Sequence, residues 1–215
     1  MRTTASTVVT TSSGAATITH SLMSGSPSFA PRFSAVMAIA PQIKGLEMPG
    51  YEPRALQTMA LGLAVGARGA DHNRSGAYEV DFSEKVNRRD VTLDAVRYAI
   101  DTEDRAALID SLIVCKFLRG VFSDFHAETA QMLRSVTGWE VTAGELRATA
   151  VRIVAAKREF NVRAGWTPEE DTLPERFLDS PLPNDPEALL SRERLEELVA
   201  EYRRQREQRG NPPVY

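Results

Sequence analysis

The chain has 215 residues, a formal net charge of −3 and a charged-residue content of 26%. The acidic balance argues against nucleic acid as a partner, and no apolar run reaches the roughly 20 residues that cross a bilayer, which argues against a membrane partner. A single cysteine excludes an internal disulfide and fits a reducing compartment, so we expect a cytoplasmic protein.

Residues 1–43 differ from the rest of the chain in composition. Thr, Ser, Ala and Gly dominate, and the first acidic residue is Glu47. Such a segment buries little apolar surface, so we predict a poorly ordered low-complexity leader over 1–43. Its acid-poor composition faintly resembles a transit peptide, and a truncation or a wrong start site would give the same pattern.

Residues 44–54 are rich in glycine and proline, and each residue before a proline is biased toward extended backbone. A short helix is predicted from Arg54 to Ala67, with Pro53 where a first turn tolerates a missing N–H. The residues predicted to share one face of this helix are Leu56, Met59, Ala60 and Leu63.

Residues 66–76 form a loop that contains three glycines and many polar groups. The polar members are Arg68, Asp71, His72, Asn73 and Arg74. Such a loop suits a ligand, with His72 moving a proton near neutral pH, or it is a solvated loop that carries a surface histidine. Residues 78–89 alternate only weakly and are predicted to be a linker.

A helical pattern runs from Leu93 to Ile109 and places Asp110 near a helix end or a break. In a continuous helix, Asp110 and Cys115 would point to different sides, whereas a break would let both face one site. Two interpretations of Cys115 stay open. It is a buried thiol that acts as a small hydrophobe, or it is a ligand to a cluster or metal whose other ligands lie elsewhere.

Two further helices are predicted from Phe117 to Val136 and from Thr142 to about Val162, the second with a Thr142–Glu145 capping box. The predicted core face of the first helix comprises Phe122, Phe125, Met132, Leu133 and Val136. The apolar residues of the second fall near one side, and they are Leu146, Ile153, Val154 and Phe160. The charged residues of the second helix are predicted to form a solvated face, and they are Arg147, Arg152, Lys157, Arg158 and Glu159.

Prolines punctuate the chain from Phe160 to Pro186, which indicates an ordered wrapping segment. A charged helix is predicted from Asp185 to Gln208, packing through Leu189, Leu190, Leu195, Leu198 and Tyr202. The predicted fold class is therefore mainly α: an irregular helical domain with long Pro-rich wrapping segments over 44–180, and a charged C-terminal helix and tail over 181–215.

Four segments, in this order, carry a family resemblance. They are 44–54 with 60–64, 68–74, 110–115 (similar to a D-x-x-G-L-C motif), and 160–165 with 171–177. Over roughly residues 43–180 the chain resembles the C-terminal part of the aldehyde ferredoxin oxidoreductase family, the tungsten pterin enzymes.

The resemblance implies roles for matching positions. Cys115 would be one of four ligands of a [4Fe–4S] cluster. Asp110 would accept hydrogen bonds from a pterin, and Val114 would contact the same pterin through its backbone. His72 would move protons near the metal of a tungsten or molybdenum bis-pterin, while a small aldehyde is oxidised and ferredoxin takes the electrons.

The chain also departs from the family pattern. Ile113 stands in place of the motif's glycine, and a β-branched residue resists a positive φ, so the loop geometry is expected to differ. The upstream C-x-x-C-x-x-x-C run and the N-terminal sheet domain have no counterpart here, and residues 1–42 show no match to the middle domain.

Two hypotheses follow. The chain is a C-terminal domain or fragment of an aldehyde-oxidising enzyme, inactive without the missing domains or a companion subunit. Alternatively, it is a non-catalytic helical remnant or interaction module that has lost the cofactor site.

Overall fold

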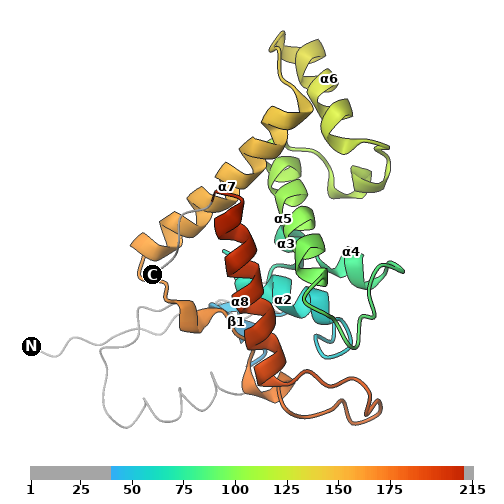
Figure 1. Cartoon of the computed structure of the whole chain (residues 1–215), viewed down its shortest axis with the longest axis vertical. Helices are drawn as coiled ribbons and strands as arrows, with labels where there is room; N and C mark the ends of the chain where they lie inside the picture. The colour runs from blue at the N-terminus through green and yellow to red at the C-terminus, as the bar shows by residue number, and fades with distance from the viewer. Residues whose placement is uncertain (1–39, 211–215) are drawn as a thin grey trace, which may run out of the picture. The chain divides into compact units, whose positions relative to one another are not determined.

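The structure is a computed structural model that describes residues 40–210. The leader predicted over 1–43 therefore lies outside the described residues except for its last four positions. Two of those four form β1 (Gln42–Ile43), which pairs antiparallel with β2 (Leu46–Glu47). The described part is mainly helical, as predicted (Figure 1). None of its helices has the length and apolarity that a membrane span requires.

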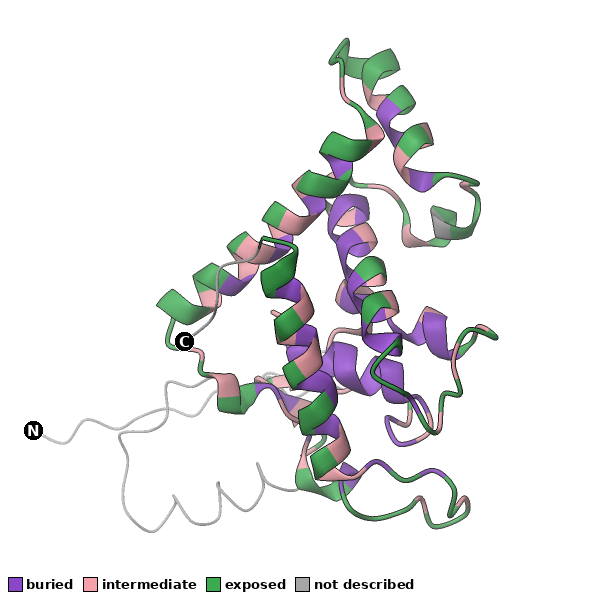
Figure 2. Cartoon of the chain, in the orientation of Figure 1, coloured by how far each residue is buried: buried purple, intermediate pink, exposed green. Residues whose placement is uncertain are grey.

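The helix α2 (Gln57–Val65) is buried on every side. Its position agrees with the predicted helix, but it begins three residues later than Arg54, and Pro53 precedes it. The four residues predicted to share a face are buried, and the rest of α2 is buried too, because α3, α4, α5 and α8 pack around it (Figures 1 and 2). A helix in this position needs small and apolar residues all round.

The predicted linker 78–89 was wrong at its start, where a short helix, α4 (Tyr78–Asp81), packs on α2. The buried carboxylate of Asp81 accepts hydrogen bonds from Thr58 N at 3.0 Å and Met59 N at 2.8 Å. The N-cap residue of α2, Leu56, has no side chain that could do this. Asp81 therefore satisfies first-turn N–H groups that have no partner within α2, from a position more than 20 residues away in the sequence.

The stability contributed by Asp81 is expected to depend on pH. Burial raises the pKa of Asp81 to about 6, above its ordinary value of 3.8. The folded state then binds the proton more tightly than the unfolded state. The stabilisation that protonated Asp81 gives the folded state is fully present below about pH 4 and is lost as the pH rises through about 6.

Relative to an Asp81→Asn variant, which cannot titrate there, the free energy of unfolding should fall by roughly 2–3 kcal/mol between pH 4 and pH 7. Urea unfolding of both proteins across this range measures the difference. Parallel pH profiles for the two proteins would contradict a raised pKa of Asp81 in the folded state.

Three long helices, α5 (Ala95–Ser111), α7 (Ala143–Arg163) and α8 (Arg192–Gln208), build most of the remaining structure. The predicted Leu93–Ile109 helix and the Thr142–Glu145 capping box are confirmed. A buried ionic cluster joins α8 to α5. Arg206 donates to Glu103 and, at 2.5 Å, to Asp104. The Tyr202 hydroxyl donates to Glu103 at 2.6 Å, and burial raises the pKa of Tyr202 to about 12, so the phenol remains a donor.

The helix predicted from Phe117 to Val136 is two pieces, the 3-10 helix η2 (Lys116–Gly120) and α6 (Phe125–Thr137). Asp124 fixes the start of the second piece, because its carboxylate accepts from His126 N and Ala127 N and caps α6. Phe125 is buried against α5 and α7, whereas Val136 is 84% exposed and Met132 is also exposed. The predicted core face of α6 is thus only partly covered in residues 40–210 (Figure 2).

The segment between α7 and α8 wraps over the helices with two short 3-10 turns, η3 (Pro168–Glu170) and η4 (Glu175–Phe177). The solvated face predicted for α7 was wrong for Arg158, which is buried beside Asp171. The final helix begins at Arg192 rather than Asp185. Of its predicted contacts, Leu189 is exposed, whereas Leu190, Leu195, Leu198 and Tyr202 are buried as expected.

Candidate functional site

The glycine-rich polar loop contains a one-turn helix, α3 (His72–Ser75), which the sequence did not predict. Asp71 caps it by accepting from Asn73 N at 3.0 Å. The His72 ring lies 5.4 Å from the Tyr51 ring and 5.5 Å from the Tyr78 ring, and the two tyrosine rings stack at 5.9 Å. His72 is therefore partly buried in an aromatic group rather than carried on a fully solvated loop.

Helix α5 ends at Ser111, so the predicted break between Asp110 and Cys115 is present. Val114 N donates to Ile109 O at 2.9 Å, which closes the turn, and Ile113 takes a φ of +58° with 92% of its surface exposed. Ile113 thus adopts the positive φ that its β-branched side chain resists. The turn keeps the left-handed residue that glycine allows in the family motif, at a cost in strain.

Replacing Ile113 with glycine is expected to raise the free energy of unfolding by about 1 kcal/mol. The left-handed conformation costs a side-chain-bearing residue roughly 1–2 kcal/mol, and the exposed side chain loses little packing. The greater freedom of glycine in the unfolded chain offsets part of this gain. Urea unfolding measures the change. Ile113→Ala, which keeps the Cβ, should show a smaller gain, and a loss in the glycine variant would contradict the strain argument.

One ion pair and one hydrogen bond join α3 to the segment that contains Asp110 and Lys116. Arg74 Nη1 donates to Asp110 Oδ2, and Lys116 Nζ lies 3.0 Å from Oδ1. Lys116 Nζ also donates to Asn73 O at 2.9 Å. The segments that carry His72 and Cys115 are therefore tied together through Asp110. Sequence reasoning missed Arg74 and Lys116 as the partners of Asp110. The only signal was that Arg74 lies inside one motif and Lys116 directly follows another.

The thiol of Cys115 is exposed, so the interpretation of a buried small hydrophobe was wrong. The turn and η2 around it also expose large apolar side chains, namely Ile113, Phe117, Leu118 and Val121, which we call the apolar turn. Within residues 40–210, no group of three or more His, Cys, Asp and Glu side chains could hold a metal ion. Cys115 is the one cysteine of the chain, so a cluster that used it would need its other ligands from elsewhere.

Comparison with known proteins gives concordant matches. The family model described as "Aldehyde ferredoxin oxidoreductase, domains 2 & 3" matches residues 7–212. The match covers most of residues 1–42, so the interpretation that this segment has no counterpart in the middle domain was wrong. The poorly ordered leader over 1–43 remains a prediction.

Curated relatives named "Tungsten-containing aldehyde ferredoxin oxidoreductase" are similar over 149 residues, which is 67% of this chain. The protein of Pyrococcus furiosus is 34% identical, that of Thermococcus kodakarensis 33% and that of Pyrococcus horikoshii 32%. The matched region is 24% of the length of each of these relatives.

Proposed function

Because the chain belongs to the aldehyde ferredoxin oxidoreductase family, we propose that it forms the C-terminal part of an enzyme that oxidises aldehydes to carboxylic acids and passes the electrons to ferredoxin. The main support is the turn after α5. It presents an exposed Cys115 thiol five residues after an ion-paired Asp110, with a left-handed residue at the position of the motif's glycine.

An exposed thiol on a turn fits a cluster ligand that is shared with another polypeptide segment. Cys115 would be one of four thiolates of a [4Fe–4S] cluster, which supplies the path by which electrons leave. The apolar turn beside it fits the same role. Its side chains would be covered by the polypeptide that brings the other three ligands, and the cover would keep water away from the cluster.

The geometry at Asp110 also fits a pterin. Each oxygen of the Asp110 carboxylate can accept two hydrogen bonds. The ion pair with Arg74 uses Oδ2 once and the ion pair with Lys116 uses Oδ1 once, and together they fix the orientation of the carboxylate. Each oxygen can therefore accept one more hydrogen bond, which would suit the paired N–H donors of a pterin. The tungsten or molybdenum bound to the pterin would supply the oxidation chemistry. Val114 has donated its N–H to Ile109, so its carbonyl is the backbone group that would face the ring.

His72 would serve as the group that accepts or returns a proton near the aldehyde. Imidazole changes protonation near neutral pH, and it is effective in proton transfer only when its position is fixed. The His72 ring packs against the stacked rings of Tyr51 and Tyr78, and the ion pair of Arg74 ties the same short helix to Asp110.

The decisive experiment combines the full chain with the polypeptide that carries the C-x-x-C-x-x-x-C run and the pterin domain. We expect the complex to contain iron and tungsten or molybdenum, and to reduce a viologen dye with aldehydes. Cys115→Ser should remove most of the iron while circular dichroism stays unchanged. Ile113→Gly, which restores the motif's glycine and keeps the thiol, is the matched control and should retain iron. A Cys115→Ser complex with unchanged iron would refute the ligand assignment.

The second candidate is a helical interaction module without cofactor chemistry. The apolar turn and the exposed side of α6 support it, because such surfaces mark binding to another protein whether or not a cofactor is present. The same complex separates the two candidates. Stable assembly with neither iron nor tungsten or molybdenum would favour the interaction module.

A further inference from the structure

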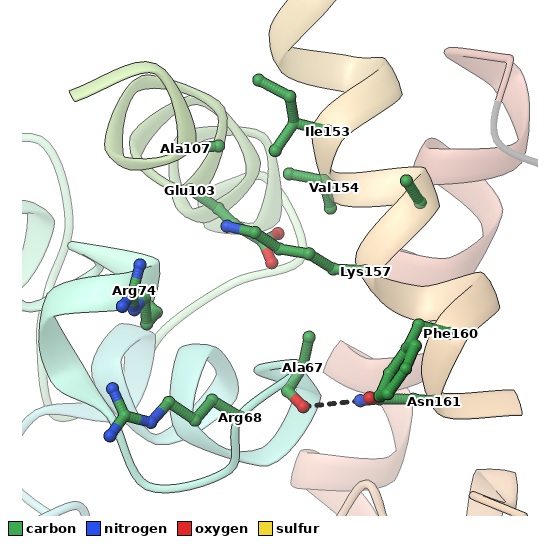
Figure 3. A pocket seen from close by; sticks show the side chains of 11 residues that line it. Ala67, Arg68, Arg74, Glu103, Ala107, Ile153, Val154, Lys157, Phe160 and Asn161 are labelled. Carbon is green, nitrogen blue, oxygen red and sulfur yellow. Dashed lines mark hydrogen bonds between the residues drawn. The ribbon is translucent and has the colours of Figure 1, made fainter. Parts of the chain in front are cut away.

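A pocket of about 580 Å³ opens between the loop before α3, the middle of α5 and one side of α7 (Figure 3). Its wall is largely apolar and comprises Ala67, Ala107, Ile153, Val154 and Phe160. Asn161 closes one end by donating from Nδ2 to Ala67 O at 2.5 Å, which holds α7 against the loop. The volume lies within the range that accommodates small organic ligands.

Most charges of this pocket are already paired. Arg68 pairs with Asp71, Arg74 pairs with Asp110, and Glu103 accepts from Arg206 and the Tyr202 hydroxyl. Lys157 differs from them. Its Nζ makes no hydrogen bond or ion pair with any residue of the described range 40–210, and its side chain extends across the pocket (Figure 3).

The surroundings of Lys157 favour the approach of an anion. Burial lowers the pKa of Lys157, and the positive charges of Arg74 and Lys116 act in the same direction, against Asp110 and Glu103. A partly desolvated ammonium without a partner gains from one negatively charged group that can accept its hydrogen bonds. The other cations of the lining, Arg68 and Arg74, already have carboxylate partners, so Lys157 is the group that an anion would meet.

We propose that this pocket binds a small monocarboxylate with an apolar body, whose carboxylate pairs with Lys157 while the body packs on Ile153, Val154 and Phe160. Oxidation of an aldehyde yields an acid of this class, and the link to a reaction product rests on the proposed function. The binding itself involves only residues of this chain and needs neither the metal nor the cluster.

The test uses the full chain and benzoate, with benzamide as the neutral analogue of the same shape and acetate as the analogue without the apolar body. Calorimetry or NMR titration should show benzoate binding at least about tenfold more tightly than either analogue, since a charge-assisted hydrogen bond is worth about one to two factors of ten. Lys157→Met should lose the same factor, and Lys157→Arg should keep most of the affinity. Lys85→Met, an exposed lysine outside the pocket, should change nothing.

Equal affinity for benzoate and benzamide, or no benzoate binding at millimolar concentration, would overturn the proposal. Unchanged benzoate affinity in Lys157→Met would do so as well. The comparison of ligands on the unaltered chain remains decisive even if a Lys157 variant fails to fold. A chain that does not bind benzoate could still form an iron-containing complex. Failure of carboxylate binding is therefore distinguishable from failure of the proposed function, which the iron content of the complex tests.

Discussion

Replacing Asp171 with asparagine is expected to lower the free energy of unfolding by about 3–5 kcal/mol, the loss typical when one partner of a buried ion pair is removed. The side chain of Asp171 has no exposed surface and lies within 2.7 Å of Lys44 Nζ, 3.0 Å of Arg203 Nη2 and 3.6 Å of Arg158 Nη2. One carboxylate therefore pairs with cations from the β-hairpin, α7 and α8.

The size of this effect follows from the cations that would remain. The side chains of Lys44 and Arg158 are each 9% exposed, so neither can be hydrated without a local opening. Burial lowers the pKa of Lys44, and Asp171 is the main group that opposes this shift. Lys44 also donates to Ala64 O and Gly66 O, which fixes the hairpin over the end of α2. Without Asp171 these contacts should weaken as well.

Asp101→Asn is the matched control, because Asp101 forms its ion pair with Arg209 at 2.8 Å while its side chain is 59% exposed. An exposed pair of this kind contributes at most about 1 kcal/mol. Urea unfolding of both variants at pH 7 gives the comparison. Equal losses would mean that the buried pairs around Asp171 contribute no more than a surface pair.

The position of Asp171 illustrates what sequence could and could not predict. Local patterns were sufficient for α5 and for the start of α7, where apolar periodicity and the Thr142–Glu145 capping box act over a few residues. Asp171 carried no comparable signal beyond its place in a family motif. Its partner Lys44 is 127 residues away, and no local rule connects the two. The same reason hid the contact of Asp81 with α2.

Periodicity also predicts an apolar face without predicting what covers it. The α6 pattern was read as a core face, yet Val136 is exposed, whereas α2 is surrounded and has no exposed face at all. At the candidate site, a helix end or break at Asp110 followed from the end of the Leu93–Ile109 pattern. The ion pair of Asp110 with Arg74 did not, because it depends on how α3 packs against α5.

Gly69→Ala should destabilise the chain by at least about 3 kcal/mol for two separate reasons. Gly69 has a φ of +82°, which a residue with a Cβ adopts at a cost of roughly 1–2 kcal/mol. In addition, a Cβ built on this residue would lie 2.1 Å from Ile43 O, a distance that no packing tolerates. The clash is with backbone rather than with a flexible side chain, so the β-hairpin would have to move.

Gly45→Ala separates the two contributions. Gly45 has a similar φ of +79°, but nothing lies within 4 Å of the position of its Cβ, so only the conformational cost applies. The difference between the variants in urea unfolding measures the clash. The clash with Ile43 would also move the segment from Gly69 into α3, so Gly69→Ala should disturb the His72 ring. A shift of the His72 NMR resonances would report this disturbance. Gly45→Ala should leave these resonances unchanged. Equal destabilisation by the two substitutions would show that the β-hairpin moves away from the added Cβ without a measurable cost, contrary to the prediction.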